Sequence, residues 1–130
     1  MTTACGTAEG GENDTTNFVN LLHQKGVQTV VGFAGTTYFF YKANSLEVVT
    51  YCGAQKWMIE FTRLLGEGCN VQSAVDQAFQ LTLSANIAVS EYTMEDFLSN
   101  KIPEEDLIVE VYSGLHTCQI VGNKSQIVKH

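Results

Sequence analysis

Thr3-Ala4-Cys5-Gly6-Thr7-Ala8, near the start of the 130-residue chain, places a cysteine between small neighbours. Small side chains let the backbone turn sharply and leave the thiol accessible, and Gly6 adopts dihedral angles that other residues resist. A polar run at 12–16 with helix-capping side chains follows, and after it an apolar helical pattern. The pattern predicts a strand end, a turn that carries a thiol, a loop and a helix, which is where open α/β sheets place their chemistry. A cysteine in such a turn is also common as a small buried apolar residue, so this stretch alone leaves a nucleophile and a structural thiol open.

The composition is typical of a globular domain. The chain is 45% hydrophobic and 16% charged and has a single proline, so we predict one domain, whole or partial, over residues 1–130. The formal net charge of −7 argues against a nucleic-acid partner, because phosphate binding needs clustered Lys and Arg. No apolar run is long enough for a bilayer span and no signal-peptide pattern is present, so we expect no membrane partner and a cytoplasmic location.

The cysteines do not form a metal-binding pattern. The four of them are too widely spaced for a CxxC pair or a ligand cluster, and His116 and Cys118 on a predicted hairpin edge do not make a site by themselves. We therefore expect no metal and no cofactor. Reduced thiols of a cytosolic protein are favoured, although an even number of cysteines leaves disulfides open. The positions are Cys5, Cys52, Cys69 and Cys118.

The apolar patterns predict an α/β fold with a mostly parallel sheet flanked by helices. Residues 27–33 are short, β-branched and apolar, which is typical of a buried parallel strand. The aromatic loop at 34–45 is interpreted either as a substrate-binding wall or as a loop packed on its own side chains. Helices are predicted at about 16–25, 46–66, 70–90 and, for one turn, 94–98, and a hairpin is predicted from strands 106–113 and 117–121.

In order along the chain, several motifs resemble a known family. After the stretch around Cys5 come Gly26-Val27-Gln28-Thr29-Val30-Val31-Gly32, then Leu64-Leu65-Gly66-Glu67-Gly68, then Val71-Gln72-Ser73-Ala74-Val75. Over about residues 3–85 this ordered set resembles the second half of a caspase-like cysteine peptidase domain, closest in pattern to the CHAT and gingipain-like branches. The resemblance implies a caspase-like α/β fold of which this chain supplies the C-terminal part.

The same resemblance implies a chemistry. Cys5 would be the nucleophile that attacks a peptide carbonyl, with Gly6 in the turn at the oxyanion hole and the backbone N–H of Cys5 contributing to that hole. The family's base is a histidine upstream of the nucleophile, and His23, His116 and His130 do not match its position. The implied partners are therefore a peptide or protein substrate and an upstream segment or subunit that completes the domain.

Two alternatives remain open at this stage. One is a catalytically inactive scaffold or protein-interaction module of the same fold, with Cys5 structural. The other is an anion site at the helix after Gly10-Gly11, although the lysine of a P-loop is absent. Glu9 and Asp14 are candidates for binding a basic substrate side chain, and a solvated loop and a helix cap explain them equally.

Overall fold

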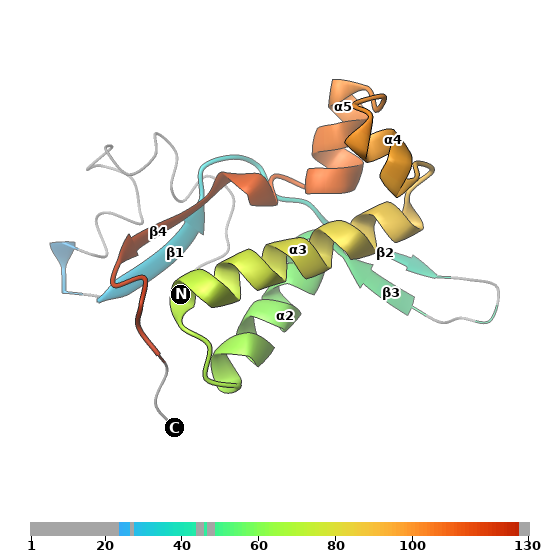
Figure 1. The fold of residues 1–130 in the computed structure, drawn as a ribbon. Coiled ribbons are helices and arrows are strands. Elements are labelled where there is room, and N and C mark those ends of the chain that lie inside the picture. The colour runs from blue at the N-terminus through green and yellow to red at the C-terminus, as the bar shows by residue number, and fades with distance from the viewer. Residues whose placement is uncertain (1–23, 27, 44–45, 47–48, 128–130) are drawn as a thin grey trace.

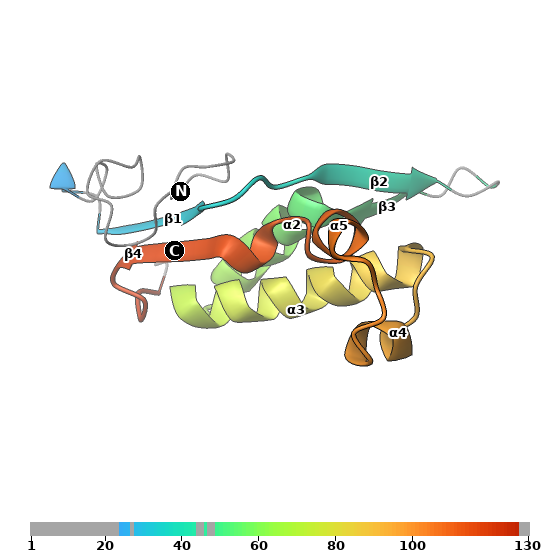
Figure 2. The ribbon, with the colours of Figure 1, turned by 90° about the horizontal axis from the view of Figure 1, so that it is seen from above.

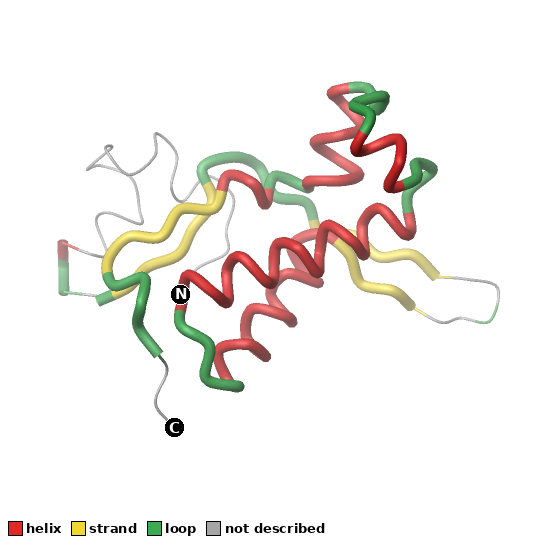
Figure 3. Tube along the Cα trace, viewed as in Figure 1, coloured by secondary structure: helices red, strands yellow, loops and turns green. Residues whose placement is uncertain are grey.

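The computed structural model describes residues 24–26, 28–43, 46 and 49–127, which form a mixed α/β structure (Figures 1 and 3). Cys5, Gly6 and all but the end of the helix predicted at 16–25 lie outside these residues. The strands are β1 (Thr29–Phe33), β2 (Phe39–Ala43), β3 (Val49–Cys52) and β4 (Cys118–Gly122). The helices are α2 (Gly53–Gly66), α3 (Val71–Val89), α4 (Met94–Leu98) and α5 (Glu104–Asp106), which continues as a π-helix (Leu107–Tyr112). A 3₁₀ turn (Leu115–Thr117) precedes β4.

The described strands form two antiparallel pairs. β1 pairs with β4, with Thr29 opposite Gly122 and Phe33 opposite Cys118, and β2 pairs with β3. The prediction that residues 27–33 contain a buried strand is confirmed, since four of the five residues of β1 are buried. The parallel pairing expected for this strand is not found among the described residues, where its partner runs antiparallel.

The core lies where α2 and α3 cover the β1–β4 pair, and Figure 2 shows both helices on one side of the strands. The Trp57 ring meets Phe33 of β1 edge-on at 5.1 Å and stacks on Phe61 at 4.6 Å. All three side chains are almost completely buried. Aromatic pairs in these two geometries add to the free energy that their burial contributes, so this cluster fixes α2 against the sheet.

The predicted helix at 70–90 is confirmed as α3, including its cap. The Asn70 side chain accepts a hydrogen bond from the Ser73 N–H at 2.8 Å. The first two N–H groups of the helix donate to the carbonyl oxygens of Gln126 and Lys124. Because the tail after β4 satisfies these donors, this helix terminus has no free N–H groups to offer an anion in its first turn.

A single buried amide joins three parts of the fold. Asn86 of α3 is fully buried. Its Oδ1 accepts from the Gly53 N–H at 2.8 Å, at the start of α2. Its Nδ2 donates to the Val111 carbonyl oxygen at 2.8 Å and to Ser113 Oγ at 3.3 Å. The side chain therefore ties the first turn of α2 to the end of the π-helix.

The segment after the π-helix turns sharply beneath the loop that follows β1. Ser113 and Gly114 have positive φ angles of 54° and 74°. The Ser113 carbonyl oxygen accepts from the Tyr38 N–H at 3.2 Å, and the Thr117 carbonyl oxygen accepts from the Ala34 N–H at 3.0 Å. Residues 34–38 are thus held by backbone hydrogen bonds to residues 113–117.

Two predicted element boundaries between residues 34 and 66 are wrong. The segment predicted as an aromatic loop contains β2, and the helix predicted from about residue 46 begins only at Gly53, after β3. Aromatic and β-branched residues favour strands, and residues 39–43 and 48–51 are rich in them. Gly53 has a φ angle of 62°, a conformation that favours glycine and separates the strand from the helix.

The hairpin predicted from residues 106–113 and 117–121 is also wrong in its first half. Residues 107–112 form the π-helix, and β4 pairs with β1 instead (Figure 3). Helix N-terminal signals override the β-branched composition here: Pro103 precedes three acidic residues in the first turn of α5. Val111 is buried and Leu107, four residues before it, packs on the same small core.

A tyrosine–aspartate pair joins the end of α3 to α5 and predicts a pH dependence. The Tyr92 hydroxyl donates to the Asp106 carboxylate, and this hydrogen bond, followed by burial, raises the pKa of Tyr92 to about 12. An unfolded tyrosine loses its proton near pH 10. The stability contribution of the pair is therefore complete below about pH 10 and is lost as the pH rises from 10 to about 12.

We expect Tyr92→Phe to remove this dependence. In urea melts, the wild type should be the more stable of the two at pH 8, and the difference should shrink through this alkaline range. Lysines elsewhere in the chain titrate in the same pH range, but they affect the stability of both proteins equally and so cancel in the difference. A difference that stays constant with pH would contradict a proton held by this pair.

Candidate functional site

The predicted nucleophile and its neighbours are not among the described residues. Cys5, Gly6, Glu9 and Asp14 lie outside them, as do His23 and His130. Of the three histidines, His116 is described: it lies exposed in the 3₁₀ turn before β4, with its ring 4.8 Å from that of Tyr112. Burial of part of the ring lowers the pKa of His116 below its usual value, so the imidazole is neutral at physiological pH.

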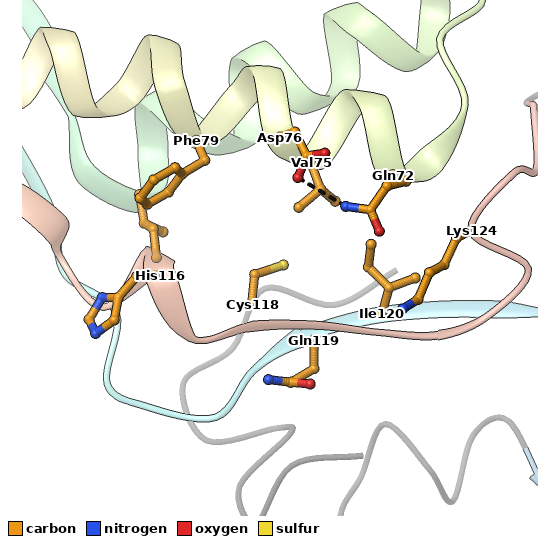
Figure 4. A pocket seen from close by; sticks show the side chains of 10 residues that line it. Gln72, Val75, Asp76, Phe79, His116, Cys118, Gln119, Ile120 and Lys124 are labelled. Carbon is orange, nitrogen blue, oxygen red and sulfur yellow. Dashed lines mark hydrogen bonds between the residues drawn. The ribbon is translucent and has the colours of Figure 1, made fainter.

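The described residues contain a groove between the first half of α3 and β4 (Figure 4). Its volume is about 270 Å³, near the lower end of the size of small-molecule sites. Helix α3 supplies one wall, and β4 with the turn before it supplies the other. The lining residues are Gln72, Val75, Asp76 and Phe79 from α3, and Leu115, His116, Cys118, Gln119, Ile120 and Lys124 from the C-terminal segment.

The floor of the groove is apolar because of strand alternation. Cys118 and Ile120 of β4 point towards α3, and Gln119 points to the opposite face (Figure 4). Val75, Leu115 and Ile120 are all buried. The floor is therefore made of core side chains, and a ligand in the groove would contact them directly.

The polar groups lie on the rim. On α3, Gln72 and Asp76 are four residues apart and share a face of the helix, and the Gln72 Nε2 donates to Asp76 Oδ1 at 2.9 Å. Lys124 lies at the same end of the groove as Gln72, and His116 lies at the end near Phe79 (Figure 4). The carboxylate of Asp76, the ammonium group of Lys124 and the amide of Gln72 thus lie beside an apolar floor.

The thiol in this groove is not a nucleophile at neutral pH. Burial, with a smaller contribution from the charge of Asp76, raises the pKa of Cys118 to about 12. The thiolate is the reactive form of cysteine, so Cys118 stays protonated and inert. The His116 side chain points away from Cys118 (Figure 4), and the two residues therefore do not form a cysteine–histidine dyad.

The other chemical groups carry no sign of a metal centre. Within the described ranges, no group of three His, Cys, Asp or Glu residues is placed to hold a metal ion. Cys52 is buried, and Cys69 and Cys118 are half-buried free thiols. None of the helices in the same ranges combines the length and the apolar character that a bilayer crossing requires.

The groove could not be found by sequence reasoning. Its two walls come from segments about forty residues apart in the chain, and no local motif connects them. Sequence patterns indicate no role for His116 or Cys118: the two do not make a metal site, and His116 does not match the position of the family's base. Comparisons with protein-family models, with curated proteins and with solved structures found no match to this chain.

Proposed function

We propose that this chain is the nucleophile-bearing half of a caspase-like cysteine endopeptidase, with Cys5 attacking a peptide carbonyl. The observation that carries the proposal is the order of the helices and strands formed by the residues of the family-like motifs. The motif at 26–32 falls on β1, the motif at 64–68 falls on the end of α2, and the motif at 71–75 begins α3 directly after its cap. After β1, the β2–β3 hairpin comes first and the two helices follow it. This order, with a strand before two consecutive helices, supports the proposal.

The sheet is compatible with this proposal. A mostly parallel sheet often carries an antiparallel strand at its edge, and β4 would be that strand. Among the described strands only β4 pairs with β1. Under the proposal, the opposite edge of β1 takes the strand that ends just before Cys5.

The loop at the carboxyl end of β1 is fixed by hydrogen bonds, and this supports a substrate site there. Ligands of open α/β sheets bind outside the carboxyl ends of the parallel strands. The loop 34–38 follows β1 and is held by hydrogen bonds from Ala34 and Gly35 to Thr117 and from Tyr38 to Ser113. Tyr38 remains 38% exposed. Under the proposal this loop is the wall along which a peptide lies beside Cys5.

The reaction needs a second group from outside the described residues. The Cys5 thiolate would form a bond to the peptide carbonyl carbon, the peptide C–N bond would break, and the leaving amine would take a proton from a histidine. Water would then hydrolyse the thioester. We expect that histidine in an upstream segment, because the base of the family that the chain resembles precedes the nucleophile, and His23, His116 and His130 do not match its position.

The rate of Cys5 alkylation as a function of pH tests the proposal. Iodoacetamide labelling followed by mass spectrometry separates the four cysteines, and Cys118, with a pKa of about 12, is a slow internal control. We expect the Cys5 rate to titrate well below the value of about 8.5 of a free thiol. Adding the upstream segment should then produce peptide hydrolysis that Cys5→Ala abolishes.

One outcome would favour the inactive scaffold instead. If Cys5 titrates at or above the free-thiol value both alone and with the upstream segment added, the proposal is wrong. In that case Cys5 is a structural thiol, and the same fold serves protein interaction. Labelling a simple free thiol such as glutathione in parallel ensures that a slow reaction at Cys5 is not caused by inactive reagent.

A further inference from the structure

We propose that the groove between α3 and β4 binds a small amphipathic amine, with the ammonium group on Asp76 and the apolar body over Val75, Leu115 and Ile120. This site would be a second one, because it does not involve Cys5 and does not depend on the peptidase proposal. Its ligand chemistry follows from the charge, the floor and the size of the groove.

The anchor is a carboxylate held in one orientation. Asp76 Oδ1 already accepts from the Gln72 Nε2 at 2.9 Å, and no described residue donates to its second oxygen. Asp76 itself is exposed, so a ligand reaches it without displacing protein. A hydrogen bond between an ammonium group and a carboxylate is about twice as strong as a neutral one.

The apolar part of the ligand has a defined place next to this anchor. Phe79 lies three residues after Asp76 on α3, and residues at this spacing share a helix face. The Phe79 ring is stacked against Tyr112, with centroids 6.2 Å apart, and Tyr112 also contacts the His116 ring. Aromatic faces attract both apolar groups and ammonium groups. An arylalkylamine or alkylamine therefore carries groups that suit both the carboxylate and the aromatic end of the groove.

Size and charge restrict the class further. A volume of about 270 Å³ suits a small molecule. Lys124 also lines the groove, at the end near Gln72, and would favour an anion. The net charge of −7 opposes anions and raises the local concentration of cations. The amine is therefore favoured over the corresponding acid.

The test compares two small molecules that have the same phenylalkyl group but opposite charges. Phenethylamine and 3-phenylpropionate are titrated into the full chain, and binding is followed by ligand-observed NMR. We expect the amine to bind with a dissociation constant in roughly the millimolar range, as its few atoms allow. We expect the acid to bind at least about tenfold more weakly. Equal binding, tighter binding of the acid, or no binding of the amine would each overturn the proposal.

A matched pair of variants locates the anchor. Asp76→Asn keeps the shape and the acceptor for Gln72 and should weaken amine binding by about tenfold or more. Glu105→Gln removes the same charge from exposed α5, at the other end of the molecule (Figure 1), and should leave binding unchanged. Thermal melting verifies that both variants fold. Loss of affinity in both variants would mean that only the net charge matters, and would overturn the assignment of Asp76.

Residue-resolved NMR locates the bound amine. Saturating phenethylamine should shift the backbone amide signals of Asp76, Phe79 and Ile120, which line the groove, and leave the signal of Cys69, which does not line it, unchanged. Shifts confined to residues outside the groove would place the ligand elsewhere and contradict the proposal. A loss of Cys5 reactivity has no part in any of these outcomes, so this proposal and the peptidase proposal fail separately.

Discussion

Gly114→Ala is expected to destabilise the protein by at least about 4 kcal/mol, a large share of the roughly 5–15 kcal/mol that stabilises a typical domain. Two effects add at this position. Gly114 has a φ angle of +74°, and a methyl group there would lie 1.8 Å from the Thr36 carbonyl oxygen. The atom in the way belongs to the backbone and cannot rotate aside. Moving it would strain the hydrogen bonds that hold the loop 34–38.

The chain supplies two matched controls for this glycine. At Gly68 the φ angle is +96°, but no atom lies within 4 Å of the added methyl group. Gly68→Ala should therefore destabilise the protein only through backbone strain, by about 1 to 3 kcal/mol. Gly66→Ala lies at the end of α2 in open space, with no strained φ angle, and should be neutral or slightly stabilising. Urea denaturation of the three variants should give this order. A Gly114→Ala variant no less stable than Gly68→Ala would show that the loop 34–38 yields easily.

Asn86→Leu is expected to cost about 3 to 5 kcal/mol, because each buried group left without its partner costs about 1 to 3 kcal/mol. The leucine fills a similar volume but removes the acceptor for the Gly53 N–H and the donor to the Val111 carbonyl oxygen. Both distances are 2.8 Å, and the side chain is fully buried. We expect α2 and the π-helix to loosen together, since this amide connects them.

Thr82→Val separates this effect from the general cost of changing a buried polar residue. Thr82 lies one turn earlier on α3, is also fully buried, and donates only to the Ala78 carbonyl oxygen of its own helix. Loss of this hydrogen bond in Thr82→Val should lower the free energy of unfolding by no more than about 1.5 kcal/mol, the net contribution of one ordinary hydrogen bond. Hydrogen exchange of the first turn of α2 should accelerate in Asn86→Leu and stay unchanged in Thr82→Val. Equal destabilisation by the two changes would contradict the connecting role of Asn86.

Sequence patterns predicted the elements that carry strong local signals. β1, β4, α3 and α4 were all expected close to their observed limits. In α3 the apolar residues recur at helical spacing after a good cap, and in β1 a short β-branched run follows a glycine. In these segments local propensity and tertiary packing favour the same structure, which is the condition under which sequence patterns succeed.

The patterns failed where packing or flanking residues decided the outcome. The alternation of apolar residues at 107–112 favoured a strand, but Val111 and Leu107 pack as one face of a helix. The acidic turn after Pro103 was the signal that was overlooked. The helix predicted from about residue 46 begins only at Gly53, whose positive φ angle separates β3 from α2.

The two candidate sites also differ in whether a local sequence pattern indicates them. Cys5 was singled out from a local motif and an ordered resemblance, and its role remains a prediction that alkylation can test. The groove with Asp76 and Cys118 depends on α3 meeting β4, about forty residues later in the chain. Such a contact is set by the packing of the whole fold, so no local pattern indicates it.

The pairing of β1 with β4 also has a consequence during synthesis on the ribosome. Phe33 and its partner Cys118 are 85 residues apart, so β1 emerges on the order of 4 to 17 s before β4 at about 5–20 residues per second. During that interval the apolar side chains of Val30, Val31 and Phe33 lack the strand that pairs with them. The β1 segment is therefore exposed to aggregation during this interval, and a chaperone that binds short apolar stretches could protect it.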